Sequence, residues 1–129
     1  MENEVYLLKA HESLAGAESE YVNGRFNNAA NRCYYACFQA AIHALADAGI
    51  HSSGRQATWS HEGLQSAFVR DLISRRKRYP SDLRDVLTRT YLLRLTADYQ
   101  HDMVSATQAG RALRRTRQFV QAVQEGGHQ

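Results

Sequence analysis

The residues that break regular structure fall between segments of helical periodicity, and this constrains the fold of the chain more than any other feature. Proline occurs once, at Pro80, and glycines cluster at 49–63 and near the C-terminal end. Such residues mark turns and loops, and no run of alternating apolar and polar residues indicates a strand. The sequence therefore predicts an all-α fold, an antiparallel bundle of four to five helices. Its 129 residues suit a single domain, expected over 1–124, with a disordered tail at 125–129.

Apolar residues that recur every three or four positions place the expected helices. They cover about residues 3–21, 27–47, 61–76, 81–99 and 105–123. Asn23-Gly24 is expected to close the first helix. Ser60 and Ser81 are expected to cap the third and fourth, because a serine hydroxyl accepts a hydrogen bond from a free backbone N–H at a helix start. The segment 49–59 lacks periodicity and is predicted to be a surface loop.

The second helix carries a ridge of mostly small side chains at every fourth position. The ridge consists of Ala29, Cys33, Cys37, Ala41 and Leu45. Small residues let a neighbouring helix approach closely, so this helix is predicted to be the central one. Its two cysteines lie one turn apart in apolar surroundings, which favours buried thiols over a disulfide. A metal or redox pair is the alternative.

Composition narrows the class of protein. Hydrophobic residues make up 43% of the chain, and the apolar runs are too short to span a membrane. The segment MENEVYLLKA has acidic residues where a secretory signal carries positive charge, so we expect a cytoplasmic protein with no membrane partner. The sequence contains no HExxH motif and no Cys/His cluster with ligand spacing, and we expect no metal and no cofactor.

The basic residues favour polyanionic partners, although their charge density is far below that of a dedicated nucleic-acid coat protein. The net charge is +3, and nearly all basic side chains are arginine, with lysine only at 9 and 77. A planar guanidinium matches the oxygens of a phosphate, although a GC-rich genome would produce the same bias. Two basic runs lie at Arg70 with residues 75–78, and at Arg111, Arg114, Arg115 and Arg117. Each run is interpreted either as a solvated face or as a phosphate contact.

Polar residues interrupt the second helix where a plain bundle helix would show lysine and glutamate. They are Asn27, Asn28, Asn31, Arg32, Tyr34 and Tyr35. Polar groups in a crowded helix need hydrogen-bond partners. Two interpretations stay open: a buried network or dimer interface that fixes the packing, or the lining of a nucleotide or RNA site.

The fourth helix changes along one face from apolar to charged. The residues expected to share this face, at steps of three or four, are Leu83, Leu87, Tyr91, Arg94, Asp98 and His101. Arg94 and His101 would lie roughly 10 Å apart along the axis. Such a set could cleave RNA without a metal, with His101 taking the proton of a ribose 2′-hydroxyl and Arg94 stabilising the phosphate charge. The alternative is an i,i+4 ion pair of Arg94 with Asp98, and a histidine that ends the helix.

Three sequence elements, in this order, resemble the HEPN domain family. They are FNNAANRCYYACFQAAIHAL in the second helix, SHEGLQSAF at the start of the third, and YLLRLTADYQH in the fourth. The similarity covers roughly residues 5–120, and the NRxYYAxF and RxxADY elements are its most specific parts. The resemblance implies a bundle of four or five helices, a homodimer packed around the central helices, and a partner nucleotidyltransferase of the small MNT type, in a pair that looks like a toxin and its antitoxin.

The resemblance also implies two alternatives for function. In the first, which we favour, the chain binds a nucleotide, RNA or the nucleotidyltransferase without catalysis. The residues expected to bind are Asn28, Arg32, Tyr35 and Tyr99, together with Arg94 and Asp98. In the second, the chain is a metal-independent ribonuclease toxin, in which Arg94 and His101 of each protomer form a shared site assisted by Asp98.

Overall fold

The computed structural model describes residues 2–52 and 58–127, and all regular structure in these ranges is helical. The α-helices are α1 (Glu2–Val22), α2 (Phe26–Asp47), α3 (His61–Ala67), α4 (Val86–Tyr99) and α5 (Ala106–Gln124). A π-helical segment, η1 (Phe68–Arg75), continues α3, and a short 3-10 turn, η2 (Ser81–Leu83), precedes α4. The prediction of an all-α helical bundle is confirmed.

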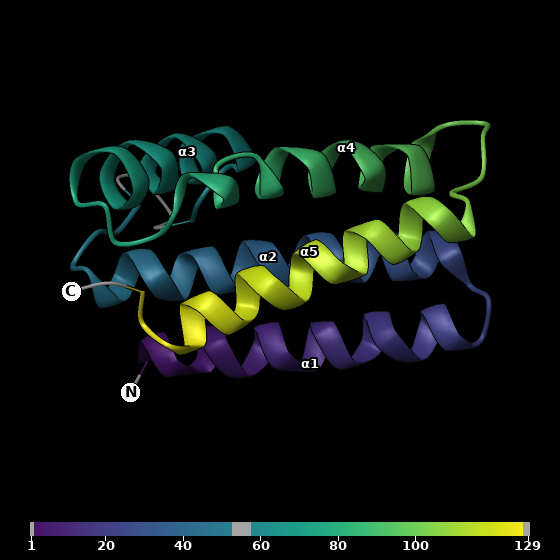
Figure 1. Cartoon of the computed structure of the whole chain (residues 1–129), viewed down its shortest axis with the longest axis horizontal. Helices are drawn as coiled ribbons and strands as arrows, with labels where there is room; N and C mark the ends of the chain where they lie inside the picture. The colour runs from purple at the N-terminus through teal and green to yellow at the C-terminus, as the bar shows by residue number, and fades with distance from the viewer. Residues whose placement is uncertain (1, 53–57, 128–129) are drawn as a thin grey trace.

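Four long helices lie side by side and alternate in direction (Figure 1). Helix α5 crosses the front of the bundle, α1 lies along one edge, and α3 and α4 follow one another along the opposite edge (Figure 1). Helix α2 contacts α1, α3, α4 and α5. The prediction that the second helix is central is therefore confirmed.

The ridge of small side chains on α2 forms the middle of the core. All five of its members, Ala29, Cys33, Cys37, Ala41 and Leu45, are fully buried. The two cysteines are free, and burial raises the pKa of Cys33 to about 11 and that of Cys37 to about 12. Both side chains are therefore protonated, apolar thiols at neutral pH, as the sequence predicted.

An aromatic cluster joins the end of α5 to η1. The ring centroids of Phe68 and Phe119 are 5.1 Å apart, and those of Phe68 and Tyr79 are 5.4 Å apart. Both phenylalanines are fully buried, and burial of such a side chain contributes about 1.5–3 kcal/mol. This cluster packs the α3–η1 segment against α5.

The helix ends follow the sequence in two of the three places where caps were predicted. Gly24 has a positive φ of 77° after α1, and the Ser60 hydroxyl accepts a hydrogen bond from the Gly63 N–H. The prediction that Ser81 caps the fourth helix is wrong. The chain first makes the η2 turn, which buries Leu83, and α4 begins after Asp85. The Asp85 carboxylate accepts a bond from Arg89 instead of capping the helix.

Two boundaries differ from the sequence analysis. The expected helix 61–76 is α3 followed by η1, where the Arg76 N–H donates to the carbonyl of Asp71, five residues back. The expected disordered tail includes Gly126 and Gly127, yet the Gly126 carbonyl accepts from Arg78 Nε at 3.2 Å and the Gly127 N–H donates to Ala122. Residues 128–129, and residues 53–57 of the predicted loop, lie outside the described residues. Among the described helices, none is long and apolar enough to cross a membrane.

Candidate functional site

The guanidinium of Arg94 lies among the rings of four tyrosines. The ring centroids of Tyr34, Tyr91, Tyr35 and Tyr99 lie 4.9, 5.4, 5.8 and 6.0 Å from its central carbon. Tyr34 and Tyr35 come from α2, and Tyr91 and Tyr99 flank Arg94 on α4. Each cation–π contact contributes about 0.5–1 kcal/mol, and more where water is excluded. The Arg94 side chain is only 15% exposed, so the tyrosines hold a positive charge in a largely dry place.

Asp98 fixes this arginine and ties α4 to α2. Its carboxylate lies 3.5 Å from Arg94 Nη1, one turn earlier on the helix, and accepts a hydrogen bond from Asn31 Nδ2 of α2 at 3.0 Å. Two groups therefore orient one carboxylate, which in turn orients the guanidinium. The i,i+4 ion pair predicted from the sequence is present, and Asn31, one of the polar residues singled out in the second helix, belongs to the same network.

The Nε donor of Arg94 remains unused. Its Nε is buried and has no hydrogen-bond partner among the described residues. A buried polar group without a partner costs about 1–3 kcal/mol, and such groups concentrate where an arrangement serves function rather than stability. The site therefore holds a cation that its own protein contacts satisfy only in part.

His61 also belongs to this cluster, although the sequence analysis did not select it as a site residue. It is the first residue of α3, directly after the Ser60 cap. Its ring stacks on Tyr91 with centroids 3.9 Å apart, and its Nδ1 is 3.3 Å from the Tyr34 hydroxyl. No local spacing signals this contact, because His61 and Tyr34 are 27 residues apart in the chain.

Burial sets the protonation states beside Arg94. It lowers the pKa of His61 below the ordinary 6.5; Glu62 opposes this shift, and the Arg94 charge adds to it. Burial also raises the pKa of Tyr34 to about 12, against the effect of Arg94. At neutral pH the pair is therefore a neutral imidazole and a neutral phenol, which can share a hydrogen bond in either direction.

The structure does not place His101 with Arg94 on one helix face. Helix α4 ends at Tyr99, and Gln100 has the extended conformation, with φ −94° and ψ 161°. His101 lies in the bend beyond it and is exposed. The prediction that the shared face continues from Asp98 to His101 is wrong, because the chain leaves the helical path between them.

The other predicted binding residues lie in three places. Tyr35 and Tyr99 contact Arg94, as described above. Asn28 is exposed on α2. Arg32 faces α1, where its side chain lies near Gly16, and it lines a small hollow with Glu12 and Glu20. Arg32 is therefore separate from the Arg94 cluster.

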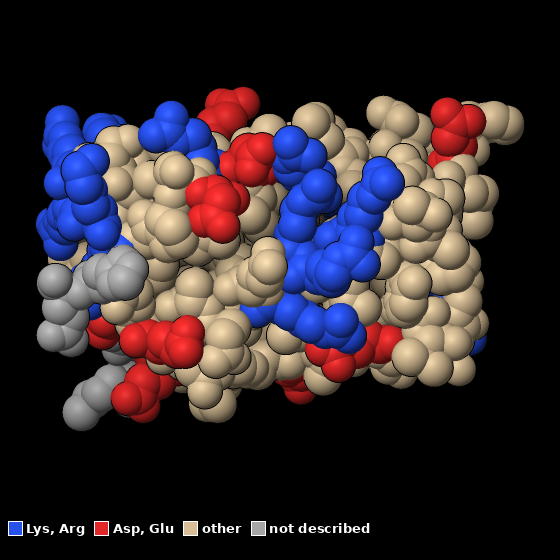
Figure 2. All heavy atoms as spheres, viewed as in Figure 1, with Lys and Arg blue, Asp and Glu red and all other residues tan. Residues whose placement is uncertain are grey.

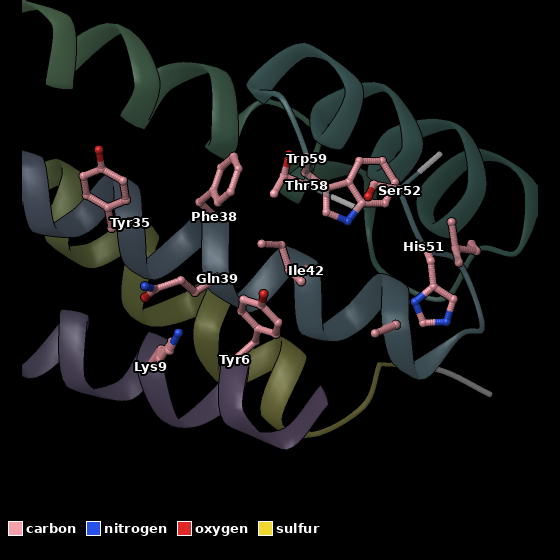
Figure 3. A pocket seen from close by; sticks show the side chains of 12 residues that line it. Tyr6, Lys9, Tyr35, Phe38, Gln39, Ile42, His51, Ser52, Thr58 and Trp59 are labelled. Carbon is pink, nitrogen blue, oxygen red and sulfur yellow. The ribbon is translucent and has the colours of Figure 1, made fainter. Parts of the chain in front are cut away.

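A groove of about 650 Å³ lies beside the cluster and shares Tyr35 with it. Tyr6 and Lys9 of α1 form one side, and Tyr35, Phe38, Gln39 and Ile42 of α2 form its floor (Figure 3). Trp59 and His51 lie toward the other end (Figure 3). The groove thus combines several aromatic faces with the Lys9 ammonium and the Gln39 amide, and Tyr35 both lines it and lies 5.8 Å from Arg94.

The described residues were also searched for a metal site, and the chain was compared with known proteins. Among the described residues, no three His, Cys, Asp or Glu side chains gather as a metal would require. A family model described as the HEPN domain matches residues 4–126 of the chain. Comparison with curated proteins gives no match.

Proposed function

The chain belongs to the HEPN domain family, and from this premise we propose that it binds RNA or a nucleotide through Arg94. We further propose that it acts in the cytoplasm, as one component of a toxin–antitoxin-like pair with a small nucleotidyltransferase. The observation that carries the proposal is the Arg94 guanidinium, held by Asp98 among four tyrosine rings. A pre-positioned arginine fork binds phosphate with little further loss of side-chain freedom.

The adjoining groove supports a ligand that has both a flat ring and a phosphate. Tyr35 lines the groove and also lies 5.8 Å from Arg94, so a base in the groove would leave its phosphate near the guanidinium. Aromatic side chains stack on any base, and each stack contributes about 1–3 kcal/mol. Lys9 at the groove wall adds a second positive charge. These features suit a nucleotide or one unit of a single RNA strand.

Binding of a fluorescent ATP derivative and of a short single-stranded RNA, followed by fluorescence anisotropy, tests the proposal. Arg94→Lys keeps the charge and loses the fork, and we expect about 10- to 100-fold weaker binding, the equivalent of one charged hydrogen bond. Arg75→Lys is the matched control, because Arg75 also pairs with an aspartate one turn away at 3.5 Å but is 71% exposed. Equal affinities for the two variants would refute the role of Arg94.

A ribonuclease that uses Arg94 and His101 without metal is the second candidate. His101 is exposed in the bend beyond α4, where an RNA strand could reach its imidazole, and a histidine in such a place suits the role of a general base. The test is cleavage of a mixed RNA pool in EDTA by the wild type and by His101→Ala. Loss of cleavage in a folded His101→Ala protein would support it, and an inert wild-type protein would refute it.

We also propose a homodimer in which the end of α4 lies at the interface. Tyr99 and Met103 are each 73% exposed there, and a second copy would remove both from water. Sedimentation of the wild type against Tyr99→Ser/Met103→Ser tests this proposal; a monomeric wild type contradicts it. The nucleotidyltransferase partner is proposed from the family resemblance, and it is expected to co-purify with the chain.

A further inference from the structure

A second hollow, of about 360 Å³, lies between α4 and α5. Three arginines line it, Arg89 from α4 and Arg111 and Arg115 from α5, together with the polar side chains of Thr96 and Gln108. We call it the arginine groove. Figure 2 shows that basic side chains gather over α4 and α5, near the middle of this face of the molecule. The sequence placed Arg111 and Arg115 in one basic run but gave no indication that Arg89 joins them.

The positive charge of this groove is poorly compensated. Helix α5 contains no acidic residue and four arginines. Arg117 pairs with Glu18, and Arg89 pairs with Asp85 at 2.7 Å. Arg111 and Arg115 form no ion pair or side-chain hydrogen bond with a described residue. The carboxylate whose charge interacts with Arg115 is that of Asp85, which Arg89 already binds. Within a chain of net charge +3, two unpaired guanidinium groups on one helix turn form a concentrated positive site.

The arginine groove is separate from the Arg94 cluster. Successive residues of an α-helix are turned by about 100°, so Arg89, Leu92 and Thr96 project from the side of α4 opposite to Tyr91, Arg94 and Asp98. The first set lines the arginine groove, whereas Arg94 contacts tyrosines of α2. A substitution in one site therefore need not disturb the other.

We propose that the arginine groove binds the phosphate backbone of an RNA strand, as a second contact surface for the ligand; this inference rests on the proposed function. The guanidinium fork matches phosphate oxygens and is the side chain that proteins use most for them. Gln108 contributes its Oε1 to the cap of α5, and its amide N–H groups remain for a ligand. Leu92, which is 56% exposed at the rim, offers an apolar surface to a base or ribose.

An RNA strand explains these features better than an acidic protein surface does. The hollow is concave and reaches down to the buried side chains of Thr90 and Ala112. A phosphate on a flexible strand can enter such a hollow, whereas carboxylates on a folded surface approach as a broad patch. The donors around the hollow are arginine and amide groups, the types that dominate contacts with phosphate and sugar in nucleic-acid complexes.

The test is the salt dependence of binding to a labelled single-stranded RNA of about 15 nucleotides, with salt varied from about 50 to 200 mM. We expect Arg111→Gln/Arg115→Gln to weaken binding at low salt. The slope of log K against log salt should fall in magnitude by about 0.7 for each lost contact, or about 1.4 for both. Arg70→Gln/Arg75→Gln is the charge-matched control and should keep the wild-type slope. Circular dichroism checks that both proteins are folded.

The outcomes separate this inference from the proposed function. If Arg94→Lys loses RNA or ATP binding while Arg111→Gln/Arg115→Gln behaves as the wild type, the proposed function stands and the arginine groove is refuted. If only the groove variant loses RNA binding, the groove stands and the role of Arg94 falls. Equal losses in the groove variant and the Arg70/Arg75 control, or competition by polyglutamate as strong as by unlabelled RNA, would overturn the groove as an RNA site. A wild type that binds ATP but no RNA would overturn it as well.

Discussion

Replacement of Asp98 by alanine is expected to destabilise the fold by about 2 kcal/mol. The carboxylate lies 3.5 Å from Arg94 Nη1 and 3.0 Å from Asn31 Nδ2. We assign about 2 kcal/mol to the bond with the charged partner and about 1 kcal/mol to the neutral one. Removing the negative charge from the last turn of α4 restores about 1 kcal/mol of stability, because an anion is unfavourable at a helix C-terminus. The net loss of about 2 kcal/mol in the free energy of unfolding exceeds the roughly 0–1 kcal/mol that a surface ion pair contributes.

The matched variant is Asp71→Ala. Asp71 also has an arginine one turn away at 3.5 Å, Arg75, and a second at 3.0 Å, Arg70. The Asp71 side chain is less exposed than that of Asp98, at 14% against 27%, but Arg70 and Arg75 are 56% and 71% exposed, whereas Arg94 is 15% exposed. Water therefore solvates the arginines that Asp71→Ala leaves unpaired, and the expected change is about 0–1 kcal/mol. Urea unfolding followed by far-UV circular dichroism measures both variants. With a slope of about 2 kcal/mol per molar urea, Asp98→Ala should move the midpoint by about 1 M.

The reasoning fails if Asp98→Ala is no less stable than Asp71→Ala. It fails also if Asp98→Asn, which keeps an acceptor for the Asn31 amide, is as destabilised as Asp98→Ala. A double-mutant cycle with Arg94→Met isolates the pairwise coupling, and a value below about 0.5 kcal/mol would mean that Arg94 and Asp98 act independently.

Three other predictions follow from burial and pKa. Cys33 and Cys37, with pKa values raised to about 11 and about 12, should not react with a thiol reagent in the native state and should both react in urea. Phe119→Ala should cost about 3–5 kcal/mol in urea unfolding, because the ring is fully buried against Phe68. Burial holds the pKa of His61 below 6.5, so the unfolded chain binds more protons just below pH 6.5 and stability falls as the pH drops through that window. His61→Phe should reduce this fall, measured as the difference in urea midpoint above and below pH 6.5.

The sequence predicted the fold well because the signals that specify it are local. The small-residue ridge from Ala29 to Leu45 recurs every fourth position and is fully buried, and Ser60 caps the next helix through a bond three residues away. Ser81 has the same capping motif in the sequence, but it does not cap α4 in the structure. Leu83 is buried in the η2 turn and α4 begins only at Val86; such tertiary burial is not visible in a capping motif.

The site was predicted in part, and the two misses have different physical causes. Arg94, Asp98 and Tyr35 were identified from their positions in two helices, and Tyr99 from the family resemblance; the structure brings the four together. His101 was included because its spacing continued a helix that in fact ends at Tyr99. His61 was left out because its contacts with Tyr34 and Tyr91 join separate elements of the fold. Periodicity locates residues along one helix, but it carries no information on which helices meet.

The two faces of α4 illustrate this limit and also suggest how the helix works. One face carries an arginine that aromatic rings and an aspartate enclose, and the opposite face carries Arg89 beside two arginines of α5. The enclosed guanidinium of Arg94 restricts the positions that a bound phosphate can take. The arginines open to solvent on the other face attract a polyanion over a Debye length of about 8–10 Å. The open face would therefore govern the approach of a strand and its salt dependence, and the enclosed face would discriminate what is bound. On these two proposals, one helix would provide selectivity and electrostatic attraction from separate positions.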